Sequence, residues 1–537
     1  MTLLYLTAFV FLARLVASAQ NLTVDLGYAR YKGRGLSDGI AQWLGVRYAA
    51  SPVGSLRFSA PQDPEAVDGV QEASQHGPLC IPTGDSPAPA GTSEDCLFLD
   101  VYAPSASKNS TGLPVFVWIQ GGGFNTNSNA NYNGTGLIQA SGTGIVVVTF
   151  NYRVGPYGFL SGQEVLKGGS VNNGLKDQLK VLNWVQTHIS KFGGDPKHVV
   201  IGGDSAGAAS VTLLLSAYGG KDQGLFHAAA AESQSFAPML TVNQSQFTYN
   251  NLVIRTGCAS ETDTLACLRN LDTASLQSEN FNTPFPTAQK APLYMYGPVL
   301  DGDLVLDYTY RLFHQGKFIK VPVIFGDDTN EGTIFVPKNT SSVSEADTFI
   351  QSQFPNISLV QLAKINNWYL TENQTRQFPH AKPYWRPAGN AYGEIRYICP
   401  GIDMSTVYSQ AGVNSWNYHY DVQDPDAEAS GDGVTHTVEA NAIWGPQYVS
   451  GTPPSSYFTS NAPIVPVMQG YWTSFIKTFD PNPHRSLDSP EWKTWGVGNE
   501  SYHRIWIRTN QTAMETVPTD QQERCKYLTS IGTDLQQ

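Results

Sequence analysis

One serine of this chain lies in the pattern that a serine nucleophile needs. Residues 203–207 read "GDSAG", with the apolar run "HVVI" before them and the helix-like "AASVTLLL" close behind. At such a strand-to-helix turn the middle residue is strained and its side chain stands above the sheet, and glycines flank it because a Cβ would collide. The following helix would direct free N–H groups at Ser205. The context predicts a nucleophile rather than a plain turn of small residues.

A serine hydroxyl is a poor nucleophile alone, so a base and an acid that orients the base are expected. On this kind of turn the chain order is serine, acid, histidine. The strand-like "VPVIFG" (321–326) runs into "DDTNEG", which contains Asp327, Asp328 and Glu331. The residues alone predict that one of these three is the acid.

The base should then come from the histidines that follow, which are His380, His419, His436, His484 and His503. His419 lies inside the strand-like "WNYHYDV" and is expected to be a packed core residue. His436 lies in "SGDGVTHTVEA", a glycine-bearing loop beyond that strand, where it could reach across to the serine. This reasoning favours His436, with His484 and His503 as the main alternatives.

A run of three glycines, "IQGGGF" (119–124), follows the apolar "LPVFVW". Glycines in a row carry an entropic cost, so the position must require them. No G-K-[ST] follows and no G-x-G-x-x-G helix start is present, which excludes the common phosphate-binding loops. A tight loop at a strand end can bring bare N–H groups to a developing oxyanion, and we expect this loop to do so.

The elements that must position these residues alternate between strand and helix. Residues 113–118 and 144–150 are continuous, apolar and β-branched, as buried parallel strands are. Residues 172–194 have apolar positions at helical spacing and end at two glycines. Residues 321–326 and 415–422 also read as strands, the second alternating and aromatic. This βαβ order predicts a large, mostly parallel α/β sheet with helical and loop insertions.

The Ser-, Pro- and Asn-rich segments near 81–92, 424–433 and 450–463 are expected to be loops. No linker divides the chain cleanly, so residues 20–537 are predicted to form a single domain. The net charge is -12, and no basic cluster appears. Nucleic-acid binding requires a positive face, so that class of function is not expected. No later run is long enough to span a membrane, and the oligomeric state is not encoded in any visible pattern.

The N-terminal residues 1–19 predict a secretory signal peptide, because an apolar run ends at Ala17-Ser18-Ala19. Two other features suit secretion. The cysteine count is even, at six, with no C-x-x-C spacing. Nine N-x-[ST] triplets are candidate glycosylation sites, beginning at Asn21, Asn109, Asn133, Asn243, Asn339, Asn356, Asn373, Asn499 and Asn510.

Several blocks of the sequence carry a family resemblance. In chain order they are "GVRYAASPVGSLRF" (45–58), "EDCLFLDVYAP" (94–104), "GGGF" (121–124), "NYRVGPYGFL" (151–160), "GLKDQ" (174–178), "FGGDPKHVVIGGDSAGA" (192–208), "NEGTIF" (330–335) and "GVTH" (433–436). Together they resemble the type-B carboxylesterase/lipase family, the cholinesterase-like branch of the α/β-hydrolases, and secreted fungal members in particular. The resemblance implies the α/β-hydrolase fold, with one twisted central sheet flanked by helices.

The resemblance also implies roles for single residues. The nucleophile matches Ser205, the base His436 and the acid Glu331, which resolves the choice among three acids. The oxyanion donors match the backbone N–H groups of Gly122, Gly123 and Ala206. The implied disulfides are Cys80–Cys96, Cys258–Cys267 and Cys399–Cys525, and the implied structural ion pairs are Arg57–Glu94 and Arg153–Asp177.

This chain departs from the pattern of the family that it resembles at several positions. The loop between Cys80 and Cys96 has no aromatic residue, so a choline site of the cholinesterase kind is not expected. That loop has fifteen residues, too few for the long lid that larger fungal lipases hold there. Residue 204 is Asp where many relatives have Glu, and residue 120 is Gln where many have His, which backbone oxyanion donors should tolerate.

The function implied is a secreted serine esterase that hydrolyses carboxylic esters through an acyl-enzyme, without metal or organic cofactor. The short loop favours an open site for short or medium acyl or aryl esters, including feruloyl-type esters. The alternative in the same class is a lipase or sterol esterase for long acyl chains. A distant alternative is a non-catalytic secreted binding protein, since some family members have lost the serine.

Overall fold

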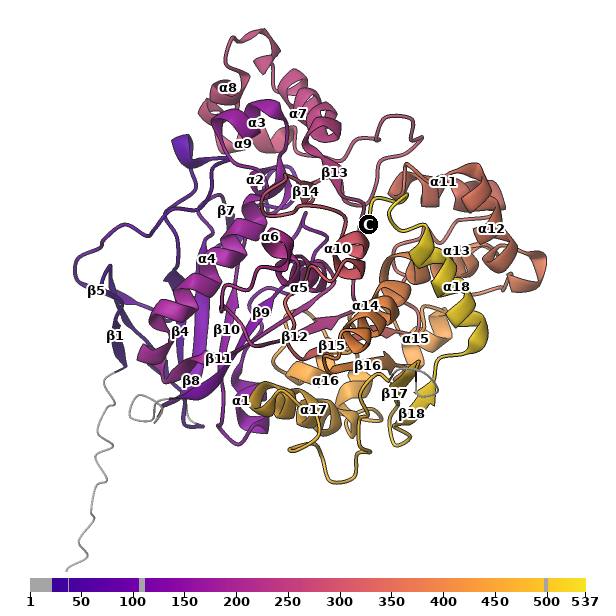
Figure 1. The fold of residues 1–537 in the computed structure, drawn as a ribbon. Coiled ribbons are helices and arrows are strands. Elements are labelled where there is room, and N and C mark those ends of the chain that lie inside the picture. The colour runs from indigo at the N-terminus through magenta and orange to yellow at the C-terminus, as the bar shows by residue number, and fades with distance from the viewer. Residues whose placement is uncertain (1–21, 37, 106–111, 497–500) are drawn as a thin grey trace, which may run out of the picture.

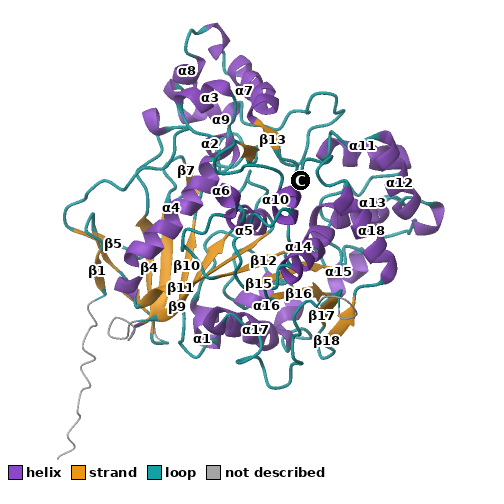
Figure 2. Ribbon diagram, in the orientation of Figure 1, coloured by secondary structure: helices purple, strands orange, loops and turns teal. Residues whose placement is uncertain are grey.

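A single large sheet forms the centre of the computed structural model, which describes residues 22–36, 38–105, 112–496 and 501–537 (Figure 1). Helices surround the sheet on both faces (Figure 2). From one edge to the other, its eleven strands are β18 (Ala513–Thr516), β17 (His503–Ile507), β16 (Ser415–Tyr420), β15 (Val323–Asp328), β12 (Ala228–Glu232), β11 (Gly194–Asp204), β9 (Leu113–Ile119), β10 (Val146–Phe150), β8 (Phe98–Pro104), β4 (Ile40–Arg47) and β3 (Arg34–Gly35).

The strands from β10 to β17 all pair in parallel, whereas β8, β4, β3 and β18 pair in antiparallel fashion at the two edges. The sheet is therefore mostly parallel, as predicted. Three small sheets lie outside it, formed by β1 (Thr23–Asp25), β2 (Arg30–Lys32) and β5 (Val70–Glu72); by β6 (Leu79–Cys80) and β7 (Thr92–Ser93); and by β13 (Leu240–Thr241) and β14 (Val299–Leu300).

The helices fall mostly between successive strands, as a parallel sheet requires. They are α1 (Thr135–Ala140), α2 (Gly155–Phe159), α3 (Gln163–Gly168), α4 (Asn173–His188), α5 (Ala206–Leu215), α6 (Ala217–Gly220), α7 (Val242–Arg255), α8 (Thr264–Asn270), α9 (Thr273–Ser278), α10 (Thr309–His314), α11 (Val343–Gln353), α12 (Leu359–Tyr369), α13 (Trp385–Gly393), α14 (Cys399–Gln410), α15 (Pro425–Ser430), α16 (Ala440–Trp444), α17 (Ile464–Thr478) and α18 (Thr519–Ser530).

The central strand β9 shows why the sheet is covered on both faces. Successive side chains of a strand point to opposite faces. Val115, Val117 and Ile119 join the core that includes α4 and α5, whereas Phe116 and Trp118 join the core that includes α16 and α17. A strand buried on both sides must be apolar at every position, which explains the unbroken run of apolar residues.

All six cysteines are paired, and the pairs are Cys80–Cys96, Cys258–Cys267 and Cys399–Cys525. These are the pairs that the resemblance implied. The bridge from α14 to α18 closes a loop of 126 residues. A cross-link over so long a loop restricts the unfolded chain most, so it ties the C-terminal helix to the body of the protein.

The two expected ion pairs are also formed, and both are buried. Arg57 binds Glu94 through two nitrogens at 2.7 and 2.5 Å, and Arg153 binds Asp177 at 2.8 and 2.7 Å. The Arg57 guanidinium also donates to the carbonyl of Leu271 at 2.7 Å. Because every charge has several partners, the pairs can brace loops without leaving a buried charge uncompensated.

The loop predicted near 424–433 is wrong in part, because residues Pro425–Ser430 form α15. Asp424 accepts hydrogen bonds from the N–H groups of Asp426 and Ala427, and Pro425 occupies the first turn, where its missing N–H carries no penalty. Gly431 ends the helix in the left-handed conformation. The composition of this segment indicated a loop, but its N-terminal and C-terminal caps stabilise a short helix.

The predicted signal peptide, residues 1–19, lies outside the described residues. Within the part of the chain that the structure describes, no helix is both long enough and apolar enough to cross a bilayer.

Candidate active site

Ser205 occupies a sharp turn between β11 and α5. Its backbone has φ 55° and ψ -118°, a conformation that residues with a side chain rarely adopt. A Cβ at Gly207 would lie 1.9 Å from the carbonyl oxygen of Ile119, and a Cβ at Gly203 would lie 2.7 Å from the same atom. Both glycines of the motif are therefore required by close backbone approach.

His436 and Glu331 are brought together by two paired loops. Nδ1 of His436 forms a hydrogen bond with Oε2 of Glu331, and both side chains are buried. The N–H of Asn330 donates to the carbonyl of Val434 at 2.8 Å, and the N–H of Val434 donates to the Asn330 side chain at 3.0 Å. The loop after β15 thus fixes the loop that carries His436, and the carboxylate favours the tautomer with the proton on Nδ1.

The serine and the histidine are both attached to the end of β12. The N–H of Ser205 donates to the carbonyl of Glu232 at 3.0 Å, and the Ser233 hydroxyl accepts from the N–H of Thr437 at 3.2 Å. Adjacent residues of one strand end therefore hold the serine turn and the histidine loop. Among the described residues, Nε2 of His436 is buried with no hydrogen-bond partner, so the structure does not join it to Ser205 by a hydrogen bond.

The other candidate histidines have different places. His419 lies in β16 and contacts Glu515 and Thr329 through its two nitrogens, which confirms that it is a packed residue. His503 begins β17, and His380 and His484 are exposed. None of these is bound to the acid candidates through a hydrogen bond among the described residues.

The glycine loop after β9 has the geometry that only glycine accepts easily. Gly122 has φ 114° and Gly123 has φ 60°. A Cβ on Gly122 would lie 2.2 Å from the carbonyl oxygen of Thr126, and one on Gly123 would lie 2.3 Å from the ring of Tyr294. No described residue accepts a hydrogen bond from the backbone N–H of Gly122, Gly123 or Ala206. Three unused donors are thus available near the serine turn.

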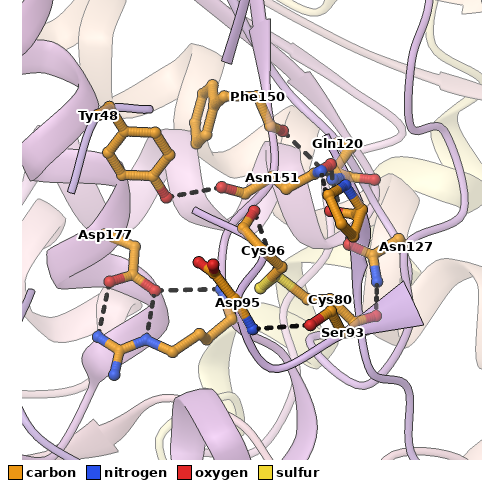
Figure 3. Close-up of a disulfide and its surroundings, with 12 residues drawn as sticks. Tyr48, Cys80, Ser93, Asp95, Cys96, Gln120, Asn127, Phe150, Asn151 and Asp177 are labelled. Carbon is orange, nitrogen blue, oxygen red and sulfur yellow. Dashed lines mark hydrogen bonds and ion pairs between the residues drawn. A yellow bond between two sulfur atoms is a disulfide. The ribbon is translucent and has the colours of Figure 1, made fainter. Parts of the chain in front are cut away.

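Gln120 anchors the start of this loop (Figure 3). Its amide nitrogen donates to the carbonyl of Phe150 at 3.2 Å and to the side chain of Asn151 at 3.1 Å. Asn127 at the far end of the loop donates to the carbonyl of Cys80 at 2.8 Å, which connects the loop to the first disulfide. The side-chain amide of Gln120 therefore holds the start of the loop in place, which is consistent with the expectation that Gln is tolerated at this position.

A group of buried carboxyl groups lies behind the site and was missed by the sequence reasoning. It comprises Asp204, Glu232, Asp328 and Glu439, all at most 1% exposed. Burial raises the pKa of each carboxyl above its usual range, and neighbouring carboxylates add to the effect. No sequence signal could have found this group, because its members come from four separate segments.

Asp328 and Glu439 lie on either side of the Ser233 hydroxyl, which is 3.3 Å from Oδ2 of Asp328 and 3.2 Å from Oε1 of Glu439. Their other oxygens are buried without a hydrogen-bond partner among the described residues, and burial raises the pKa of both carboxyls. Glu439 also accepts from Ser233 at 3.2 Å and from Tyr418 at 2.8 Å. Because Ser233 holds the histidine loop, these two carboxyls support the position of His436.

The raised pKa of Asp328 leads to a prediction about stability and pH. The folded protein binds a proton at Asp328 more tightly than the unfolded chain does, so the contribution to stability is complete below about pH 3.9 and is lost as pH rises toward the raised pKa. The substitution Asp328→Asn keeps a neutral donor at all pH values. We expect its melting temperature relative to wild type to rise with pH, by on the order of 2 °C or more between about pH 4 and pH 8.

The control for this measurement is Asp303→Asn, which changes an exposed aspartate. Thermal unfolding, followed by circular dichroism at several pH values, gives the melting temperature of each variant relative to wild type. A melting-temperature difference for Asp328→Asn that stays constant or falls with pH would contradict the raised pKa of Asp328.

A small cavity begins at the glycine loop. Its volume is about 60 Å³, and its lining includes Gly123, Ala209, Thr212 and Leu213 of α5, residues 235–240 and residues 294–299. A water molecule needs roughly 10–15 Å³ on this measure, so the cavity has room for several water-sized groups. The space next to Gly123 therefore suits a short chain better than a long one.

One group of potential metal ligands occurs in the described part of the chain, namely Glu394, Cys399 and Cys525. Both cysteines are joined in a disulfide. The thiolates that a metal would need are thus absent, and the group offers only one carboxylate.

The fold and the site together define a class of protein. A mostly parallel sheet between helices carries a strained serine at a strand-to-helix turn, followed in the chain by a carboxylate and a histidine on later strand-end loops. This arrangement is that of an α/β-hydrolase.

The chain belongs to the carboxylesterase family, because the model of the Carboxylesterase family matches residues 20–527. It is therefore a carboxylic ester hydrolase. A solved structure, that of Aspergillus niger EstA, superposes with a TM-score of 0.92 at 44% sequence identity and covers 96% of this chain and 99% of that chain.

Curated relatives are similar over most of the chain. Secreted lipase 4 of Gibberella zeae is 30% identical over 488 residues, which cover 88% of this chain and 85% of the relative. Secreted lipase 1 of Botryotinia fuckeliana is 30% identical over 538 residues, covering 90% and 88%. Lipase 1 of Geotrichum candidum is 36% identical over 338 residues, covering 55% and 60%.

Proposed function

We propose that this protein is a secreted serine esterase that uses Ser205, His436 and Glu331 as its catalytic triad. The observation that carries the proposal is the strained serine turn together with the buried pair of His436 and Glu331. Ser205 and His436 are not hydrogen-bonded, but such contacts are often long before substrate binds. The order of the three residues in the chain fits the class.

In the proposed mechanism, Nε2 of His436 removes the proton of Ser205 as its hydroxyl oxygen attacks the ester carbonyl. Glu331 holds the imidazole in the required tautomer and stabilises its positive form. The N–H groups of Gly122, Gly123 and Ala206 donate to the oxyanion. His436 then gives its proton to the leaving alcohol, and a water molecule hydrolyses the acyl-enzyme by the same route. Each oxyanion donor contributes roughly 3 kcal/mol.

Secretion is part of this proposal, with residues 1–19 as a signal peptide and residues 20–537 as a single mature domain. Two of the relatives are named secreted lipases, and the three disulfides suit an oxidising compartment. Of the candidate glycosylation sites, Asn21, Asn109 and Asn499 lie outside the described residues. The described ones are exposed except for Asn133, which is half-buried.

For the substrate, we propose esters of short acyl chains. The cavity of about 60 Å³ beside Gly123 leaves little room for a long chain. The loop between Cys80 and Cys96 is also too short for a large lid. The second candidate is a lipase acting on long acyl chains, which the names of the curated relatives favour.

A series of 4-nitrophenyl esters from acetate to decanoate, each assayed below and above its solubility limit, tests this choice. We expect kcat/KM to be highest at two to four acyl carbons and to fall with length, with no sudden increase above the solubility limit. Maximal activity on an emulsified long-chain triglyceride, with a jump at the onset of the emulsion, would favour the lipase instead.

A further inference from the structure

The cavity beside Gly123 contains a buried positive charge. Arg396 lines it, is 5% exposed, and stands in the single π-helical turn Glu394–Ile398 between α13 and α14. Among the described residues that line the cavity, Arg396 is the sole charged one. Single π-turns inside α-helices occur often at functional sites. A guanidinium at this depth is unfavourable unless acceptor groups replace its lost hydration.

No carboxylate in the described part of the chain lies within 4.0 Å of the Arg396 nitrogens. The adjacent Glu394 is instead bound to Arg524 at 2.8 Å. The guanidinium donates from Nε to Ser235 at 3.3 Å and from Nη1 to Tyr392 at 3.0 Å, and no described residue accepts from Nη2. The charge is therefore only partly satisfied within the protein.

Three aromatic rings surround the guanidinium. Its central carbon lies 5.5 Å from the ring of Tyr294, 5.8 Å from Tyr392 and 5.6 Å from Tyr397. Such contacts attract a cation, but they do not neutralise it. Burial raises the pKa of all three phenols, so the rings remain neutral. The three rings therefore hold the arginine side chain in place, and its positive charge remains available to bind an anion.

The charge lies close to the proposed reaction centre on two sides. Tyr294 fills the space that a Cβ of Gly123 would occupy, and the ring of Tyr397 lies 4.4 Å from that of His436. The ring of Tyr294 thus lies between Arg396 and the oxyanion loop, and the ring of Tyr397 lies between Arg396 and His436. Gly123 of the oxyanion loop lines the cavity, whereas Ser205 and His436 do not. We take the cavity to hold the acyl chain, because Gly123 donates to the carbonyl oxygen of the acyl group in the proposed mechanism.

We propose that Arg396 binds a carboxylate at the far end of a short acyl chain, so that half-esters of short dicarboxylic acids are preferred substrates. The proposal rests on the proposed function, because it assigns a specificity to that same site. A guanidinium binds a carboxylate through parallel charge-assisted hydrogen bonds, and Nη2 has a free donor for this purpose. The bound carboxylate would neutralise the charge that the protein leaves uncompensated.

The test compares monoethyl succinate with ethyl succinamate, which differ only in carboxylate against neutral amide. Ethanol release gives kcat/KM for each ester with the purified wild-type protein. We expect the ratio to favour the half-ester by about tenfold or more, the effect of one charge-assisted interaction. Arg396→Gln should bring the ratio to about unity, and Arg396→Lys should retain part of the preference. Because a ratio is measured, a general loss of activity in a variant cancels.

The matched control is Arg311→Gln, which removes an exposed guanidinium on α10 and should leave the ratio at the wild-type value. If Arg396→Gln does not fold, the ratio of kcat/KM for the half-ester to that for the amide in the wild-type protein still tests the proposal. A ratio near unity overturns it. A preference that appears only when the carboxylate is on the alcohol side, as in 3-acetoxypropanoate, also overturns it. Hydrolysis of ethyl succinamate with no preference for the half-ester refutes the specificity alone. Failure both to hydrolyse these esters and to be labelled at Ser205 by a serine-directed organophosphate refutes the proposed function as well.

Discussion

Replacement of Ser205 by alanine is expected to lower kcat by about 10⁵- to 10⁶-fold, because the acyl-enzyme can no longer form. Alanine fits the turn at least as well as serine, since the side-chain hydroxyl makes no hydrogen bond with a described residue. The melting temperature should therefore stay close to that of wild type. Hydrolysis of 4-nitrophenyl acetate measures the first effect, and thermal unfolding measures the second.

A serine-directed organophosphate provides an independent measurement of the same residue. Wild-type protein should gain one label per chain at Ser205, identified by peptide mass spectrometry, and Ser205→Ala should gain none. Ser344→Ala, which changes an exposed serine of α11, is the control and should be labelled like wild type. Activity of folded Ser205→Ala within tenfold of wild type would disprove the proposed nucleophile.

The substitution Glu331→Gln is expected to lower kcat by about 10⁴-fold. The side chain keeps its size, but an amide no longer stabilises the imidazolium of His436 and favours the wrong tautomer. Glu331 also accepts from the N–H of Asp328 at 2.8 Å, and the amide oxygen can preserve that contact. The fold should thus survive, and the loss should appear in kcat more than in KM.

The control for Glu331→Gln is Glu372→Gln, at an exposed position, which should behave as wild type. The double variant with Ser205→Ala adds a sharper test. Residues that act as one catalytic unit are not additive, so the double variant should be about as slow as Ser205→Ala alone. A kcat for Glu331→Gln within about tenfold of wild type would show that another group orients His436.

The strands and the serine turn could be predicted because their causes are local. An apolar, β-branched run such as residues 113–118 has few alternatives to a buried strand, and β9 is found there. The turn at Ser205 requires small flanking residues, which are visible as glycines. The segment 424–433 shows the limit, since the cap made by Asp424 outweighed a loop-like composition.

The choice among acids shows a second limit. Asp327, Asp328 and Glu331 are all carboxylates within five residues, and spacing alone left them equal. The tertiary structure separates them, because Asp327 and Asp328 are buried at the end of β15 while Glu331 lies on the loop paired with that of His436. Which side chain faces a histidine about a hundred residues later depends on how two loops pair, and no local pattern records that.

The sequence by itself determined the fold class, the serine turn, the glycine loop and, through its resemblance to a family, the cysteine pairs. The tertiary structure alone revealed the buried carboxyls of Asp328 and Glu439, and the Arg396 charge without a carboxylate partner among the described residues. The physical reason is that burial and missing counter-ions are properties of assembled surroundings. Arg396 between Ile395 and Tyr397 is ordinary in the sequence, and becomes a candidate for specificity only because no carboxylate among the described residues lines the cavity around it.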